Sequence, residues 1–405
     1  MKYTFTEKTG SYLITEFQRI LKDPGAILIF IIAVIAYPVI YSVAYQNETL
    51  KNTPVSVVDL SKTKQSRTFC KMLDETDEVS IELNASNLEE AKNAFFADEV
   101  NGILLIEKDF EESIYTKNPA VIKAYADGSY FLYYKQVISA LSYSGGTLSA
   151  GIELQRFMAE GKHPEQARSQ LEPISLKVQE LHNPFGGYGS FVMPGLILII
   201  LQQTLLVGLG MMGGTFSEQQ LPWIQYQENT KTPDIVSALI GRAGAYVTLY
   251  LTTGFIVLFG VHHLFSFPDN ANILRVMMLY LPFIMAVTFL GFAISTLFQR
   301  REEAFLFLVF VSPIVMFLSG ISWPPEAIPG AVNQIGNIFP SNFMVPAYLR
   351  LRTMGAAPAD IRPEMVALLL QCVIYFGVAL VAIKWKLKKT EHQNRIQNKA
   401  SLSEA

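Results

Sequence analysis

The amino-acid sequence predicts a membrane all-α bundle of six transmembrane helices with an inserted external α/β domain. Half of the 405 residues are apolar and only 17% are charged, against about 25% charged residues in soluble proteins. The apolar residues are concentrated in six stretches, and the chain between the first and second stretch alternates strand-like and helix-like patterns. A membrane protein that carries one soluble domain accounts for both features.

Each of the six stretches is long enough to cross the apolar core of a bilayer, at about 1.5 Å per residue. The first, Ile27 to Tyr45, has no charged residue. A cleaved signal sequence is the alternative, but this stretch starts late, exceeds the roughly 7–15 apolar residues of such signals and has no small-residue cleavage site after it. The other five stretches are Phe191 to Phe216, Ile235 to Val261, Val276 to Phe298, Ala304 to Ile321 and Met365 to Ile383.

The segment 46–188 has the composition of a soluble domain, and no span fits within it. Asn87 with Glu90 three residues later is a capping-box signature for the start of a helix. Alternating strands and helices predict a small α/β domain with a largely parallel sheet. Strands are expected at 54–59, 79–83, 102–107 and 120–125, and helices at 66–74, 87–98, 109–115 and, longer, about 131–160.

The distribution of Lys and Arg predicts the orientation of the chain. Six spans place both termini on one side of the membrane, where fourteen Lys and Arg residues flank the spans, against four on the opposite side. Basic residues near spans favour the cytoplasm, and long domains do not count. Both termini are therefore expected in the cytoplasm, the large domain outside, and the protein in the bacterial inner membrane.

The predicted organisation has five parts. Residues 1–25 form a cytoplasmic interfacial helix, because apolar residues recur at helical spacing at positions 13, 14, 17, 20 and 21. The other parts are the first span (26–45), the external domain with its long helices (46–188), five further spans with a cytoplasmic coupling loop at 217–242 and outer re-entrant helices at 322–348 (together 189–385), and a cytoplasmic tail (386–405).

The missing motifs exclude several classes of function. The chain has no G-x-x-x-x-G-K-[ST] sequence, so it cannot hydrolyse ATP by a P-loop route, and it has no H-E-x-x-H or G-x-S-x-G sequence. A net charge of −3 gives no basic footprint for nucleic acid. Cys70 in the external domain and Cys372 in the last span cannot pair, and the five His residues are scattered. We therefore expect no catalytic residue and no metal site.

Polar residues are rare within the spans. No Asp, Glu, Lys or Arg lies near the middle of a span, which disfavours both a proton-driven carrier and an intramembrane hydrolase. Gln202 and Gln203, in the second span, either line a transport path or hydrogen-bond between helices, and the second interpretation is the simpler. The glycines from Gly208 to Gly214 allow another helix to approach closely.

Two loops are candidates for function. Ser217 to Arg242 mixes aromatic and charged residues, as in a short helix that docks into a partner's groove, and a solvated loop is the alternative. Between the last two spans, prolines interrupt an apolar sequence, which predicts short helices that dip back into the bilayer. The residues singled out are Glu218, Trp223, Tyr226, Glu228 and Lys231 in the first loop, and Trp323, Pro324, Pro325 and Pro340 in the second.

These features resemble the permease subunits of ABC type-2 exporters, in the branch with a large external domain between the first and second spans. The resemblance covers nearly the whole chain and rests on the order of elements, on Phe-Val-Met-Pro-Gly at 191–195 and on the outer pattern Ser319-Gly320, Pro324-Pro325, Pro340 and Arg350. The loop after the second span keeps Glu218 but lacks the Gly-Thr that usually ends the family's basic-acidic run.

The resemblance implies a subunit of an ATP-driven export channel for an amphipathic or apolar, drug-like or lipid-like substrate. ATP and magnesium would be bound by separate cytoplasmic ATPase subunits, with no cofactor on this chain, and a second copy or a sister permease would complete the pore. The second and fifth spans would line the path. The resemblance leaves open whether a periplasmic adaptor and an outer-membrane tunnel take part in export. The path residues would be Gln202, Gln203, Phe305, Phe310 and Phe317.

The alternative function is a membrane receptor or assembly scaffold that transports nothing and binds a partner through its external domain. A cytoplasmic ATPase partner distinguishes the two functions.

Overall fold

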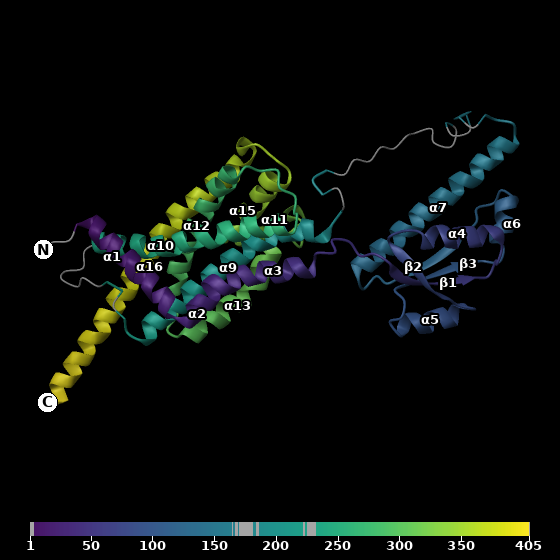
Figure 1. Cartoon of the computed structure of the whole chain (residues 1–405). Helices are drawn as coiled ribbons and strands as arrows, with labels where there is room; N and C mark the ends of the chain where they lie inside the picture. The colour runs from purple at the N-terminus through teal and green to yellow at the C-terminus, as the bar shows by residue number, and fades with distance from the viewer. Residues whose placement is uncertain are drawn as a thin grey trace. The chain divides into compact units, whose positions relative to one another are not determined.

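Helix α9 (Tyr188–Glu218) is the central helix of the helical part of the computed structural model (Figure 1). It is apolar around its whole circumference, as expected of a helix that neighbours cover on every side, and most of its residues are buried. The structure describes residues 4–163, 165, 166, 169, 181–183, 186–221, 223, 224 and 232–404, with the side chains of 232 and 391–404 left out.

The glycines of α9 let other helices approach its backbone. A Cβ atom on Gly208 would lie 2.1 Å from the ring of Phe30, and one on Gly213 would lie 2.6 Å from the Cβ of Ser295. Any larger side chain would therefore push these neighbours away. The close approach predicted from the glycine cluster is confirmed, because Phe30 and Ser295 lie directly against the backbone of α9.

Helix α1 (Phe5–Lys22) precedes α2 (Pro24–Ile27), η1 (Leu28–Ala33) and α3 (Val34–Ala44), which follow one another without a break. After α9 come α10 (Thr232–Phe255), η2 (Ile256–Val261), α11 (His262–Leu264), α12 (Ile273–Ser295), α13 (Arg301–Leu318), η3 (Pro325–Ala327), α14 (Gly330–Gly336), α15 (Ser341–Tyr348), η4 (Leu349–Thr353), η5 (Pro358–Ile361) and α16 (Arg362–Glu404). Helices α3, α10, α12, α13 and α15 pack against α9.

Among the described residues, five helices are long and apolar enough to cross a membrane. They are Pro24–Ala44, Tyr188–Glu218, Pro233–Leu264, Ile273–Ser295 and Pro358–Thr390. The predicted fifth span corresponds to α13, whose first three residues, Arg301, Glu302 and Glu303, are charged. Because of these three charges, α13 is not among the five helices that are apolar enough to cross a membrane. The prediction of six spans therefore remains a prediction.

The structure corrects the predicted loop at 217–242. Helix α9 ends at Glu218 and α10 already begins at Thr232, so residues 232–242 are helical. Pro233 and Asp234 in the first turn favour a helix start. The N–H groups of the first turn have no partner within the helix, so the N–H that proline lacks is not missed there. A negatively charged side chain also interacts favourably with the positive end of the helix dipole.

The chain forms two compact units, and Thr49–Gln179 is the second. Its four-stranded sheet has the order β2-β1-β3-β4, where β1 (Thr53–Asp59) pairs in parallel with β2 (Val79–Asn84) and β3 (Gly102–Ile106). Strand β4 (Ile122–Ala126) is antiparallel to β3. The predicted strands and the largely parallel sheet are thus confirmed.

Helices cover both faces of this sheet, as Figure 1 shows. Along β3, Leu104 and Ile106 pack with α4 (Lys64–Asp74) and α7 (Phe131–Ala159), whereas Ile103 and Leu105 face α5 (Leu88–Phe96). The two-residue period of a strand places alternate side chains in two cores. Helix α6 (Phe110–Tyr115) follows β3 and adds Phe110 and Ile114 to the first core.

A carboxylate joins the two points at which the chain leaves and re-enters the helical unit. Glu48 accepts hydrogen bonds from the N–H and the hydroxyl of Ser190, at 2.9 and 2.8 Å. Its carbonyl accepts from the N–H of Tyr188 at 2.7 Å. These bonds satisfy N–H groups at the start of α9, which have no partner within the helix.

Candidate functional site

Helix α1 packs lengthwise against α10, which brings the amino terminus to the helix that follows the loop after α9. A Cβ atom on Gly241 would lie 2.4 Å from the carbonyl oxygen of Thr9, so the contact requires a glycine. Helix α1 begins with a capping box in which Thr4 and Glu7 bond each other's backbone N–H groups. The cap fixes the helix start beside α10.

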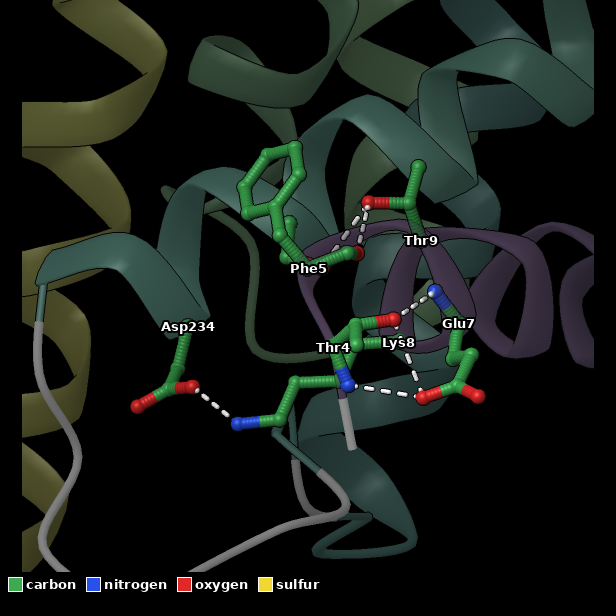
Figure 2. Close-up of polar contacts among 7 residues, drawn as sticks. Thr4, Phe5, Glu7, Lys8, Thr9 and Asp234 are labelled. Atoms are coloured by element: carbon green, nitrogen blue, oxygen red, sulfur yellow. Dashed lines mark hydrogen bonds and ion pairs between the residues drawn. The ribbon is translucent and has the colours of Figure 1, made fainter. Parts of the chain in front are cut away.

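Polar contacts hold the first turns of the two helices together (Figure 2). The Lys8 ammonium lies 2.6 Å from an oxygen of Asp234, with both side chains largely buried. The hydroxyls of Thr9 and Ser237 lie 2.9 Å apart, and Ser237 also donates to the carbonyl of Phe5 at 3.3 Å. Both helices are thereby fixed in register at their starts.

A buried charge cluster follows two turns further along. Glu16 of α1 and Arg242 of α10 are only 2% and 1% exposed, and Nε of Arg242 lies 3.6 Å from Oε2 of Glu16. Tyr246 donates its hydroxyl hydrogen to Oε1 of Glu16 at 2.8 Å, and Arg19 approaches Oε2 at 3.5 Å. Removal of Glu16 would leave the buried guanidinium of Arg242 without its carboxylate, at a cost of about 3–5 kcal/mol, whereas Glu16 would keep Arg19 if Arg242 were removed.

The same arginine holds the loop after α9. Arg242 donates to the carbonyl of Trp223 at 3.0 Å, and its guanidinium lies 4.3 Å from the centre of the Trp223 ring and 4.5 Å from that of Phe216. The indole also packs edge-on against Phe292 of α12, with ring centres 5.8 Å apart. Arg242 therefore connects α1, α9, α10 and the described part of the loop.

A second ion pair joins the end of α1 to the start of α13. Arg301 donates to both carboxylate oxygens of Asp23, at 2.5 and 2.9 Å. The hydrogen bond from Arg301 lowers the pKa of Asp23, which also caps α2 through the N–H of Ala26. A Cβ atom on Gly25 would overlap the guanidinium, so glycine makes room for the pair.

Helices α9, α12 and α16 meet near these two pairs. The hydroxyl of Ser217 donates to the carbonyl of Phe298 at 3.0 Å and receives a hydrogen bond from Lys386 at 2.7 Å. We call the region formed by Glu16, Asp23, Ser217 and Trp223 the α1 end of the bundle. Here the end of α9, the starts of α10 and α13 and the carboxyl-terminal helix are joined by polar side chains.

The predicted coupling residues lie at this α1 end, as far as they are described. Glu218 is the exposed last residue of α9, whereas Trp223 is 9% exposed and turned inward onto Arg242. Tyr226, Glu228 and Lys231 lie outside the described residues. Sequence reasoning missed Glu16 and Arg242, because 226 residues separate them and neither stands out locally.

The predicted path residues divide into two buried glutamines on α9 and three exposed phenylalanines on α13. Gln202 is buried and exchanges two hydrogen bonds with Ser341 at the start of α15, at 2.8 and 3.0 Å. This is the helix-to-helix bond that was the simpler interpretation. Gln203 is also buried, and its amide nitrogen has no partner among the described residues. Phe305, Phe310 and Phe317 are exposed on α13, Phe310 to 75%.

The predicted outer segment forms short helices, η3, α14 and α15. Gly320, with φ at +84°, turns the chain after α13, and Trp323 and Pro324 follow as exposed residues. Pro325 begins η3, and the buried Pro340 precedes α15. Helix α15 packs against α9, α12 and α16, and α14 packs against α13.

A second buried arginine was also missed. Arg352 of η4 is fully buried, donates to the carbonyl of Leu258 at 2.6 Å and to the Tyr348 hydroxyl at 2.7 Å, and pairs with Asp269 at 2.5 Å. His262 lies with its Nε2 3.5 Å from the same hydroxyl. The spacing of Tyr348 and Arg352, one helical turn apart, was the available signal. Within the described ranges, His, Cys, Asp and Glu form no group of three suited to a metal.

The apolar helices and the polar connections at one end define an integral membrane protein with several spanning helices. The chain belongs to the ABC-2 transporter family: the model described as ABC-2 family transporter protein matches residues 25–381. It is therefore a membrane transport component, and the family implies association with ABC ATPase subunits. A comparison with curated proteins gives no match.

Proposed function

We propose that this chain is the permease subunit of an ATP-driven exporter for amphipathic or apolar molecules, powered by separate ATPase subunits. In this proposal α13 is the fifth of six spans, both termini lie in the cytoplasm of a bacterial cell, and the unit 49–179 lies outside the inner membrane. The family match supports the transport role, and the excess of Lys and Arg on one side supports the orientation.

The α1 end of the bundle is the proposed coupling surface. The observation that supports this proposal is that Arg242 forms both a hydrogen bond with the Trp223 carbonyl and an ion pair with Glu16. A movement imposed on the loop after α9 would reach α1 and α10 together, because buried, bonded charges shift as a unit. In this role Glu218 contacts the ATPase directly and Trp223 is a positioning residue that holds the loop from inside.

Purification of the tagged chain from native membranes in mild detergent tests the coupling surface. We expect a stoichiometric protein with a Walker A motif to co-purify, and its yield to fall for Glu218→Ala and for Trp223→Ala. Glu326→Ala is the matched control, because Glu326 is also exposed but lies in η3, beyond the other end of α13. Copurification of an external partner without any ATPase would instead favour the receptor or scaffold function.

A second permease copy is proposed to cover α13. This helix buries Ala304, Leu308, Val315 and Leu318 and leaves its phenylalanines exposed, so the described residues leave one apolar face of α13 uncovered. An apolar face of this kind suits either a partner helix or lipid. The substrate path would then run along Phe305, Phe310 and Phe317 at the junction of two copies, with Gln203 facing it and Gln202 holding α15.

Cysteine cross-linking in membranes tests this dimer. In a background without the two native cysteines, Phe310→Cys is expected to form cross-linked dimers with a short bifunctional maleimide. Leu308→Cys, which is 3% exposed and two residues away, is the control and is expected to remain monomeric. Equal cross-linking at both positions, or none at Phe310→Cys, would contradict the proposed interface.

A further inference from the structure

The unit 49–179 contains a cavity of about 490 Å³. It lies between α4, α6, β4 and α7, on the face of the sheet opposite to α5. Cavities that bind drug-sized ligands have volumes of roughly 300–1,000 Å³, so its size is sufficient for a small organic molecule.

The walls of the cavity combine an apolar part with a polar part. Phe69, Phe110 and Leu148 belong to the buried core of the unit, and each also lines the cavity. Leu141 and Ile152 of α7 add partly buried side chains. An apolar body placed against these side chains would lose contact with water on the side that faces them.

Helix α7 leaves this space open through its small residues. Gly145 lines the cavity, and a Cβ atom added to it would meet nothing within 4 Å. Glycine inside a helix costs about 1 kcal/mol relative to alanine, and packing within the described chain does not require it at this position. Ser149, one turn further on, also lines the cavity and has a small side chain.

A charged pair on α7 also lines the cavity. Arg156 pairs with Glu153 and donates to the carbonyl of Ile114, so its guanidinium is fixed between α6 and α7. Both charged side chains remain partly exposed and line the cavity. Next to the apolar side chains of Phe110 and Leu148, such a pair offers a donor and an acceptor to a polar group at one end of a ligand.

We propose that this cavity binds a small amphipathic molecule. Its apolar body lies against Phe69, Phe110 and Leu148, and its polar end, a hydroxyl or another group that both donates and accepts, reaches Glu153 and Arg156. This site is separate from the α1 end of the bundle. The proposal does not depend on transport or on an ATPase partner.

Photolabelling of the full-length chain in native membranes tests the site. The probe is a long-chain primary alcohol that carries a diazirine and an alkyne, with unlabelled hexadecanol as competitor. Peptide mapping by mass spectrometry separates labels in 141–156 from labels in the spans, where a lipid-like probe also inserts. We expect competed labelling within 141–156 in the unchanged protein.

Two neighbouring glycines provide the variant and its control. Gly145→Leu fills the cavity and is expected to lower this labelling about tenfold, the effect of about 1.4 kcal/mol of lost binding. Gly146→Leu changes the next residue, which also has open space around it but does not line the cavity, and labelling is expected to persist. If Gly145→Leu fails to fold, as judged by heat-induced aggregation, Ser149→Leu replaces it. No competed labelling in 141–156, or equal labelling in both glycine variants, would overturn the proposal.

Discussion

Neutralisation of Glu16 is expected to destabilise the helical unit strongly. Glu16→Gln keeps the shape of the side chain and an oxygen that accepts from Tyr246, but it leaves the guanidinium of Arg242, 1% exposed, without its carboxylate. Breaking a buried ion pair in this way costs about 3–5 kcal/mol. Arg242 keeps the Trp223 carbonyl and two aromatic ring faces, so we expect the lower end, about 3 kcal/mol.

A double-mutant cycle separates the ion pair from the surrounding packing. Arg242→Met removes the charge and retains an unbranched apolar side chain of similar reach. In the double variant no buried charge is left unpaired, so it should be more stable than the sum of the single changes predicts, by about 2 kcal/mol.

Unfolding by SDS in mixed micelles, followed by tryptophan fluorescence, gives the four free energies. Trp223 reports on the site directly, because its indole lies against Arg242. Glu218→Gln, at the same end of the bundle but exposed, should change stability by less than about 0.5 kcal/mol. Additivity of the two single changes within about 0.5 kcal/mol would refute the argument that Glu16 and Arg242 stabilise each other.

Three other outcomes are expected. Gly241→Ala should cost about 1–3 kcal/mol by overpacking against a carbonyl of α1, whereas Gly244→Ala, whose Cβ would meet only a flexible leucine at 3.1 Å, should be tolerated when both are assayed by heat-induced aggregation. Because Arg301 lowers the pKa of Asp23, their pair stabilises the protein above the usual carboxyl pKa and loses this effect as pH falls through the lowered value. Arg301→Gln should remove that part of the acid sensitivity in a stability series from neutral to low pH, and an unchanged series would count against it. Gln202→Leu should lower stability by about 1–3 kcal/mol in SDS unfolding; a change in substrate KM with no loss of stability would instead assign it to the path.

Local patterns predicted most of the unit 49–179. Strands β1 to β4 begin and end within two residues of the positions expected from alternating and continuous apolar runs. The start of α5 follows the capping signature, since Asn87 accepts from the N–H of Glu90 at 2.9 Å. These signals lie within a few residues of each other, so a sequence shows them directly.

The polar connections of the helical unit could not be predicted in this way. Arg242 looked like a loop residue because charge is rare in spans, and its partner Glu16 is far away in sequence. Likewise, nothing in the sequence around Gln202 predicts its hydrogen bond to Ser341, which lies 139 residues later. The excess of basic residues on one side remains when the buried Arg242 and Arg352 are left out, with thirteen flanking basic residues against three.

The carboxylate of Glu48 makes the 49–179 unit a replaceable module. The carboxylate accepts from Ser190 and the backbone carbonyl of Glu48 accepts from Tyr188, so residues 48 and 188–190 of the helical unit are held together by their own hydrogen bonds. If a different domain or a short turn were grafted between the same two points, the hydrogen bonds of Glu48 with Tyr188 and Ser190 would still form. Relatives of this bundle could therefore gain, lose or exchange their inserted domain without rebuilding the helices beneath it.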